Sequence, residues 1–436
     1  MADLRVKFGV VEFKNPVWVA SMGSGAPWVT WKDAPEIYCR FVKKCYEEGA
    51  GGFITGLTTF REPDYEWRGK MKYLAISTRG FAEREGFISA AVFPDGLFPR
   101  SCGPKVVSLL KREFGKDMPI IANITGPGVD RQGWGDMALE MQQAGADMVE
   151  LNLNTFMNFR AISEAIEGIA ERAKYPPEAG VIAGMVPEVV INVVEGIKEK
   201  ANIPIIIKIP PEMSFWDLLV AAPKYKQAGV AGVTASHCFV GVAPPKIYDG
   251  GKPGFTGMDK TTFWAVNGPW NRFGCYTDVA GISKYAPGLD VAACGGLVIP
   301  EHAIEVMMLG AKVVQFCSGI LWNGVSFISQ VIEFMNKYMD EQGYKSVDDF
   351  TGLGLNYLVE LEEQLEDWHA HPFVAQIDYI KCTRCRTCLD NFCWAMYWED
   401  GRPKVNTKMC MGCGLCSIRC PSHAVSMKPV KPTSVK

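Results

Sequence analysis

Eight cysteines close to the C-terminus constrain this chain more than any other feature of its sequence. They form two runs, Cys382, Cys385, Cys388 and Cys393, then Cys410, Cys413, Cys416 and Cys420. Each run has three thiolates separated by two residues, which is close enough to hold three corners of one iron–sulfur cubane. Zinc sites also use cysteine pairs at this spacing, but triplets are unusual for zinc. The two runs therefore favour clusters that transfer single electrons.

The second run is followed directly by Pro421 and has the C-x2-C-x2-C-x3-C-P pattern, so it resembles bacterial two-cluster ferredoxins. In those proteins the fourth cysteine of each run binds the cluster of the other run. The first run has one extra residue before its last cysteine, which a larger loop accommodates. The resemblance implies two [4Fe–4S] clusters, one bound by Cys382, Cys385, Cys388 and Cys420, the other by Cys410, Cys413, Cys416 and Cys393.

Length and composition limit the class of protein. A chain of 436 residues has room for one large domain and one or two small ones. The net charge of −3 favours neither nucleic acid nor an anionic membrane as a partner. The N-terminus lacks the apolar core of a signal peptide, and no apolar run approaches the ~20 residues of a membrane helix. The other seven of the 15 cysteines are scattered, which is typical of a reducing compartment, so we expect a cytoplasmic protein.

Between about residues 16 and 340, short β-rich runs alternate with amphipathic helical patterns. Strands that read as continuous apolar runs and alternate with helices indicate a parallel sheet covered on both faces. Strands are expected at 17–21, 52–56, 119–125, 147–153, 204–209, 230–236, 290–294 and 312–318. Helices are expected at 35–48, 134–144, 187–200, 216–227, 301–309 and 324–339. Eight such strands predict a (β/α)8 TIM barrel, with a doubly wound open sheet as the alternative.

The domain organisation follows from these patterns. We expect an α/β barrel over residues 1–340 and a more charged, helical linker over residues 341–375. The cysteine runs lie in a small ferredoxin-like α+β domain, residues 376–428. Residues 429–436 are expected to form a tail.

Polar and small residues follow several of the expected strands, at the end of a barrel where active sites lie. Asn123, Asn152 and Lys208 end three strands, and Ser236 and His237 end a fourth. Gly295, Gly296, Cys317 and Ser318 follow the last two strands, where small residues leave backbone N–H groups free for a phosphate. Each signal is weak alone, and together they predict a phosphate-bearing ligand at this end.

In its strand-end motifs the chain resembles the dihydroorotate and dihydropyrimidine dehydrogenases. The motifs are 15-NPVWVAS, 150-ELNLN, 204-PIIIKI, 232-GVTASH, 294-CGG and 315-QFCSG. The resemblance implies that the barrel binds FMN. Lys208 would then place positive charge beside flavin N1 and O2, where negative charge develops on reduction.

The resemblance also assigns the other cofactor-binding candidates. Ala20 and Ser21 would approach the flavin ring through their backbone, and Asn123 and Asn152 would hydrogen-bond to flavin or substrate. Ser236 is a further candidate at its strand end. Gly268, Gly295, Gly296, Cys317 and Ser318 would line the phosphate and ribityl side.

The chain departs from the family around the substrate. The family's catalytic Cys or Ser falls on Thr155, followed by Phe156 in place of a proline, and its substrate-binding Asn-Thr becomes His237-Cys238. Thr155 or His237 would serve as the catalytic proton donor. The alternatives are a plain loop residue for Thr155 and a packed, hydrogen-bonded histidine for His237. A second flavin-facing lysine of the family falls on Leu57.

We therefore expect an oxidoreductase acting on CH–CH groups, which reduces or forms a carbonyl-conjugated C=C bond in a small cyclic or aromatic substrate. No G-x-G-x-x-G follows an expected strand, so electrons should come from a ferredoxin or from a separate NAD(P)H-oxidising flavoprotein subunit. A homodimer or larger complex is expected. The alternative function is an electron-transfer subunit whose flavin only relays electrons within a larger redox complex.

Overall fold

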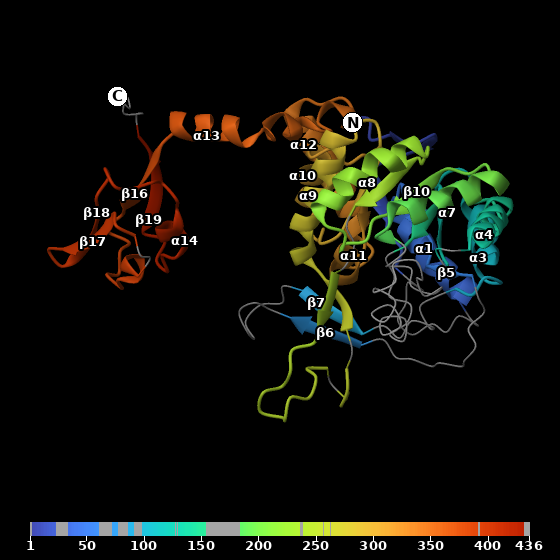
Figure 1. Cartoon of the computed structure of the whole chain (residues 1–436), viewed down its shortest axis with the longest axis horizontal. Coiled ribbons are helices and arrows are strands. Elements are labelled where there is room, and N and C mark those ends of the chain that lie inside the picture. The colour runs from blue at the N-terminus through green and yellow to red at the C-terminus, as the bar shows by residue number, and fades with distance from the viewer. Residues whose placement is uncertain are drawn as a thin grey trace. The chain divides into compact units, whose positions relative to one another are not determined.

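The protein is described from a computed structural model (Figure 1). The described residues are 2–22, 34–60, 72–76, 86–90, 98–126, 128, 130–153, 184–235, 239–255, 257–261, 263–390 and 393–430. The chain divides into two compact units, Met1–Leu355 and Asn356–Lys436. The first holds the strand-end motifs and the second holds both cysteine runs.

The first unit is a closed barrel of eight parallel strands. The strands are β3 (Val17–Val19), β4 (Gly52–Ile54), β8 (Ile120–Thr125), β9 (Met148–Asn152), β10 (Ile205–Lys208), β11 (Gly232–Ala235), β14 (Asp290–Cys294) and β15 (Val313–Phe316). Each strand pairs in parallel with the next, and β15 pairs with β3. The short strand β5 (Thr58–Thr59) also pairs with β8. Closure confirms the predicted barrel, since an open sheet would leave two edges.

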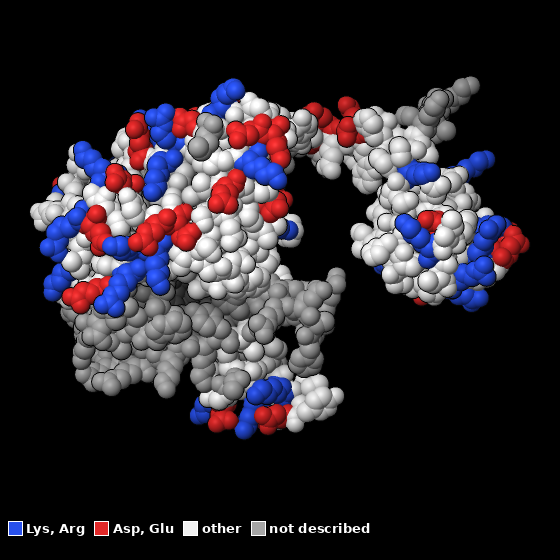
Figure 2. All heavy atoms as spheres, turned by 180° about the vertical axis from the view of Figure 1, so that it is seen from behind, with Lys and Arg blue, Asp and Glu red and all other residues white. Residues whose placement is uncertain are grey.

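Helices cover the outside of the barrel (Figure 1). They are α1 (Ala34–Glu47), α3 (Gly103–Phe114), α4 (Arg131–Gln143), α7 (Pro187–Lys200), α8 (Phe215–Gln227), η1 (Pro269–Asn271), α9 (Arg272–Tyr285), α10 (Glu301–Met308), α11 (Ser318–Asn323) and α12 (Phe327–Gln342), followed by η2 (Val347–Asp349) and η3 (Leu353–Tyr357). The six predicted helices are present, with α12 shifted three residues toward the C-terminus. Lys, Arg, Asp and Glu are interspersed over the helices, as expected from the nearly balanced charge (Figure 2).

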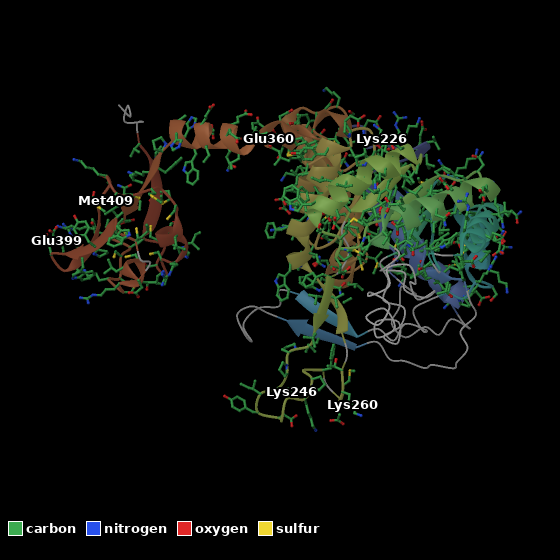
Figure 3. All side chains as sticks on the ribbon, in the orientation of Figure 1. Lys226, Lys246, Lys260, Glu360, Glu399 and Met409 are labelled. Carbon is green, nitrogen blue, oxygen red and sulfur yellow. The ribbon has the colours of Figure 1, made fainter. Side chains whose placement is uncertain are left out.

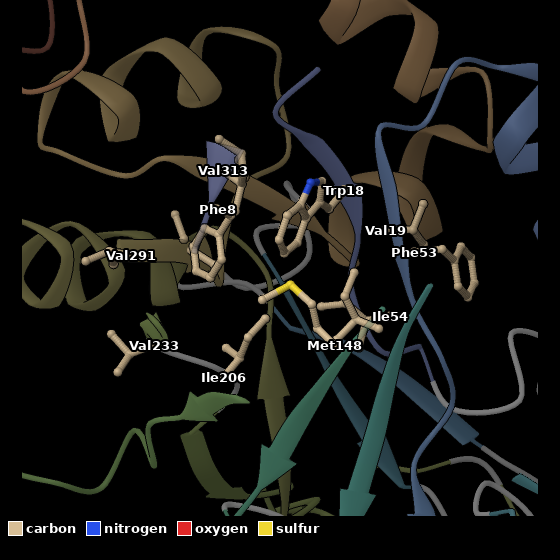
Figure 4. Packing of buried hydrophobic residues seen from close by; sticks show 14 of the residues in the cluster. Phe8, Trp18, Val19, Phe53, Ile54, Met148, Ile206, Val233, Val291 and Val313 are labelled. Carbon is tan, nitrogen blue, oxygen red and sulfur yellow. The ribbon is translucent and has the colours of Figure 1, made fainter. Parts of the chain in front are cut away.

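Apolar side chains from the strands fill one continuous core (Figure 4). A hairpin of β1 (Val6–Phe8) and β2 (Val11–Phe13) packs Phe8 and Phe13 on Trp18, with ring centroids 5.3 and 4.3 Å away. The backbone N–H of Gly9 donates to Asp290 Oδ2 at 2.7 Å. Because Asp290 begins β14, the hairpin covers the amino-terminal end of the barrel and leaves the carboxyl-terminal end for a site.

A second sheet was not predicted. Its four antiparallel strands, in the order β12, β13, β7, β6, are β6 (Lys72–Ile76), β7 (Gly86–Ala90), β12 (Phe239–Val242) and β13 (Phe263–Asn267). They come from segments that follow β5 and β11, so the sheet belongs to the carboxyl-terminal end of the barrel. Phe255 and Val266 are buried in a small core of its own.

The second unit is small and has little regular structure. It contains α13 (Leu361–Ala370), β16 (Phe373–Ile377), η4 (Thr387–Leu389), β17 (Met396–Glu399), β18 (Arg402–Val405), α14 (Leu415–Ile418) and β19 (Val425–Pro429). Strand β16 pairs antiparallel with β19, and β17 with β18. In neither unit is any described helix both long and apolar enough to span a bilayer.

Candidate active site

A pocket opens where four barrel strands end. It comprises about 420 Å³ of empty space, a figure that includes its opening to solvent. Lys208 enters it from β10 and Gln315 from β15. The complete lining is Ala20, Ser21, Lys208, Asn267, Asn271, Cys294, Gly295, Gly296, Leu297, Gln315, Cys317 and Ser318.

Seven of the cofactor-binding candidates line this pocket together. They are Ala20, Ser21, Lys208, Gly295, Gly296, Cys317 and Ser318. Asn152 on β9 and Asn123 on β8 are not part of this lining and lie on the next two strands beyond Lys208. Ser236, Thr155 and His237 lie outside the described residues. Residues from four strands thus converge on one place, although the sequence separates them by up to 298 positions from Ala20 to Ser318.

The Gly295-Gly296 turn has a shape that other residues cannot reproduce. Gly296 has a φ of +72°, in the left-handed region that glycine adopts without strain. A Cβ on Gly296 would lie 2.3 Å from the backbone nitrogen of Arg272 and 2.9 Å from the carbonyl oxygen of Gly268. The turn therefore packs directly against the start of α9, and its backbone borders the pocket.

Five buried polar residues form a network beside the pocket. Glu150 lies at its centre, with Lys208 Nζ 3.6 Å from Glu150 Oε1, and both side chains are almost completely buried. Asn123 Nδ2 donates to Glu150 Oε1, and Thr234 Oγ1 donates to Glu150 Oε2 at 2.7 Å. Gln315 Nε2 donates to Thr234 Oγ1 at 3.0 Å. The network holds a buried lysine against the pocket, and Glu150 balances its charge.

Asn152 extends this network, because its Nδ2 donates to Asn123 Oδ1 at 3.3 Å. Gln315 Oε1 is buried and accepts no hydrogen bond from the described residues. A buried acceptor of this kind is costly unless a ligand or water satisfies it. The pocket thus offers a cation, an unsatisfied acceptor and a glycine-lined turn, which suits an anionic ligand with a polar ring edge.

Two cysteines at the pocket are not activated nucleophiles. Burial raises the pKa of Cys317 to about 12, and burial also raises the pKa of Cys294. Both thiols therefore remain protonated near neutral pH, where only a thiolate would be nucleophilic. Their contribution to the pocket is small size and apolar contact.

A larger, open hollow lies on the outer side of α3 and α4. It is lined by Arg100, Lys105, Arg112 and Glu140 among others, and Arg100 Nη2 already pairs with Glu140 Oε1 at 2.6 Å. None of the predicted site residues reaches it.

In the second unit, cysteines make up much of the small core. Cys388, Cys416 and Cys420 are buried, and Cys385 and Cys413 are exposed. The remaining buried residues are Ala375, Ile377, Ala395, Met396, Pro403, Ala424 and Val425. Sulfur atoms are visible between the strands of this unit in Figure 3.

The cysteines of this unit gather in two groups of four. Burial raises the pKa of Cys388, and the neighbouring thiols that add to the shift are Cys382, Cys385 and Cys420. Burial likewise raises the pKa of Cys416, with added effects from Cys410, Cys413 and Cys393. Each group therefore combines three cysteines of one run with the last cysteine of the other.

These groups suit cubanes, in which four thiolates bind four different iron atoms. Among the described residues, no three His, Cys, Asp or Glu side chains converge as the ligands of a single ion do. A cubane does not require such convergence.

Comparison with known proteins agrees with both units. Residues 403–426 match the 4Fe-4S binding domain. The NAD-dependent dihydropyrimidine dehydrogenase subunit PreA of Escherichia coli K12 is 24% identical over 438 residues, covering 98% of this chain and 96% of that protein. The dihydroorotate dehydrogenase B (NAD+) catalytic subunit of Pyrococcus abyssi is 25% identical over 372 residues, covering 81% and 99%.

This chain is a homologue of these dehydrogenase subunits. The similarity to the Escherichia coli subunit includes both units, because it spans 98% of the chain. The resemblance drawn from the strand-end motifs is thereby confirmed, together with an iron–sulfur domain at the C-terminal end.

Sequence reasoning missed the centre of the polar network in this dehydrogenase homologue. Glu150, Thr234 and Gln315 lie within the strand-end motifs, but none of them is among the predicted site residues. Their signal was present, because a carboxylate or carboxamide inside a continuous apolar strand must find a buried partner. The partner itself, Lys208 for Glu150, could not be read from the sequence, since the two are on different strands.

Proposed function

We propose that the chain is the FMN-binding, iron–sulfur subunit of an oxidoreductase that acts on a carbonyl-conjugated C=C bond. The observation that carries the proposal is the convergence of Lys208, Gln315 and the Gly295-Gly296 turn on one pocket at the barrel's strand ends. The homology to dehydrogenases supports the reaction class. The pocket residues fit FMN, which has an anionic phosphate and a polar ring edge.

Bound FMN would supply hydride transfer to or from the substrate and exchange of single electrons with iron–sulfur clusters. Lys208 is proposed to hold positive charge at the ring edge, with Glu150 and Asn123 keeping its position. Gly295 and Gly296 would border the phosphate through their backbone. Gly268, Ser236, Ala20 and Ser21 complete the proposed cofactor site.

Two [4Fe–4S] clusters are proposed in the second unit. One would be held by Cys382, Cys385, Cys388 and Cys420, the other by Cys410, Cys413, Cys416 and Cys393. The grouping of the thiols supports this assignment. Electrons would reach the unit from a ferredoxin or from a separate NAD(P)H-oxidising flavoprotein subunit, in a homodimer or larger complex. The relatives' description as subunits supports a partner protein.

The substrate is proposed to be a small cyclic or aromatic compound. Hydride would be transferred at one carbon of the C=C bond and a proton at the neighbouring carbon. Thr155 or His237 would hold that proton. Thr155 occupies the family's proton-donor position, and His237 has an intrinsic pKa suited to neutral pH. The motif changes at both positions argue for a rebuilt substrate pocket beside a flavin site that keeps the family's motifs.

The proposal is tested on protein purified without oxygen. We expect about eight iron atoms, eight acid-labile sulfides and one FMN per chain, from two cubanes and one flavin. The dithionite-reduced protein is then mixed with candidate enones, pyrimidines and aromatic compounds, and flavin reoxidation is followed. Zinc in place of iron would overturn the cluster assignment. Reoxidation by electron acceptors but by none of the organic substrates would instead favour the relay function.

A further inference from the structure

The two cysteine loops of the second unit have matching backbones but different side chains. In the second loop, Gly412 and Gly414 flank Cys413 with φ angles of +73° and +77°. At the matching places of the first loop, Arg384 and Arg386 flank Cys385 with φ angles of +60° and +67°. Each loop leads into one helical turn, η4 or α14, whose preceding residue is left-handed. Arginine thus occupies two positions that the repeat fills with glycine.

Arginine at these positions is held against its own backbone preference. The left-handed region brings Cβ too close to the carbonyl oxygen in every residue except glycine. Residues held in such conformations cluster at functional sites, where the side chain has a role of its own. The two arginines therefore call for an explanation that the fold does not supply, because glycine would satisfy the same loop.

The charge of the arginines is not balanced locally. Among the described residues, no carboxylate forms an ion pair with Arg384 or Arg386, whereas Lys381 pairs with Asp378 at 4.0 Å. The guanidinium of Arg386 lies over the ring of Trp398, with Cζ 4.4 Å from the ring centroid. This contact holds the charge near the loop without neutralising it.

The rim of the second loop has a different character. Between Cys410 and Cys416, the residues that separate the cysteines are Met411, Gly412, Gly414 and Leu415, and none of them carries a charge. The central cysteine is exposed in both loops, so access to water does not distinguish them at that corner. Among the residues that separate the three cysteines of each loop, the only charged side chains are therefore Arg384 and Arg386.

We propose that Arg384 and Arg386 make the two [4Fe–4S] clusters unequal in reduction potential. The cluster bound through Cys382, Cys385 and Cys388 has the higher potential and holds the first electron. Each reduction adds one negative charge to a cluster, and a fixed positive charge close by stabilises that charge. The uncharged residues between Cys410 and Cys416 give no such stabilisation. The inference rests on the proposed function, because it requires two clusters in this unit.

The sequence itself supplies the test variant. Arg384→Gly with Arg386→Gly copies the second loop into the first, and the fold is expected to be retained because glycine adopts these φ angles without strain. We expect the higher of two midpoint potentials to fall toward the lower one, which itself changes little. Anaerobic redox titration followed by electron paramagnetic resonance measures both. Arg384→Lys with Arg386→Lys keeps the charge and should keep the separation.

A charge-matched control is Lys404→Gln with Lys428→Gln, which removes two positive charges outside the cysteine loops. It should leave the separation of the potentials unchanged. Unchanged potentials in the glycine variant, a fall of the lower potential instead, or an equal effect of the control would each overturn the inference. Iron and sulfide content distinguishes a failure of the two-cluster proposal from a failure of the inference about the potentials. A chain that binds a single cluster overturns the two-cluster proposal as well, whereas two clusters with equal potentials overturn this inference alone.

Discussion

The barrel and the cysteine unit are stabilised in opposite ways. The barrel buries a continuous apolar core, with Phe8, Trp18 and Ile206 completely inside, and its cofactor pocket lies at one end of that core. The cysteine unit spans Asn356–Lys436, yet its core is a few small apolar residues packed among cysteines. Units of this size rarely stabilise themselves by apolar burial alone. The difference indicates that the barrel can fold without its cofactor, whereas the cysteine unit depends on its metal.

The largest expected effect is the loss of the whole cysteine unit when its iron is removed. Metal binding at such sites supplies free energy of folding, so the unit should unfold while the barrel stays native. After iron chelation, limited proteolysis should cut the chain beyond Leu355 before it cuts the barrel. Hydrogen exchange should likewise label the residues beyond Leu355 before those of the barrel. Cys388→Ser should have the same effect, and Cys39→Ser in α1 is the control. If both units were equally protected from proteolysis and hydrogen exchange without iron, the cysteine unit would not depend on its metal for folding.

A smaller but still large effect is expected inside the barrel from Lys208→Met. It leaves Glu150 charged and buried without its partner, which destabilises a protein by about 3 to 5 kcal/mol. Denaturant unfolding of the FMN-free protein measures this loss. Adding Glu150→Gln should recover most of the stability but not the FMN affinity, measured by quenching of flavin fluorescence. If the double variant is no more stable than Lys208→Met, the pair is not the source of the loss.

A moderate effect is expected from Gly296→Ala, with Gly324→Ala as its matched control. Both glycines have positive φ angles, +72° and +82°, but only a Cβ on Gly296 meets other atoms within 4 Å. Backbone strain should destabilise either variant by about 1 kcal/mol. Gly296→Ala should lose more, and it should also bind FMN more weakly. Equal FMN affinity in the two variants would separate the turn from the cofactor site.

The smallest expected effect is a pH dependence of the barrel's stability that does not involve the metal. Burial raises the pKa of Asp278 on α9 to about 7. The folded barrel therefore holds this proton between about pH 4 and pH 7, while the unfolded chain releases it. Stability contributed by Asp278 is accordingly lost as the pH rises through this range. Asp278→Asn should stabilise the barrel at pH 8 by about 1 to 2 kcal/mol and change little at pH 4.5, as measured by thermal unfolding. If the thermal stability of the parent protein and of Asp278→Asn changed with pH in the same way, the raised pKa of Asp278 would be contradicted.

The second sheet shows where sequence patterns stop being informative. Strands β7 and β13 pair through Ala265 and Ser89, yet each lies in a segment that carries no regular apolar alternation. Their pairing depends on the barrel, which brings the ends of β5 and β11 to the same side. Helix α9 was missed for a related reason, because its glycines and aromatics weaken the helical period.

Local patterns in the sequence determined the eight barrel strands, the six expected helices and the grouping of cysteines into runs. These features depend on residues close together in the chain, such as apolar runs and thiolates two residues apart. Tertiary structure alone decided that Glu150 faces Lys208, and that Arg384 and Arg386 take the backbone conformation of glycines. Buried charges and strained dihedral angles are tolerated only where distant segments hold them in place. Those distant contacts leave no pattern of their own in the sequence, which is why the electrostatics of this protein emerged only from its fold.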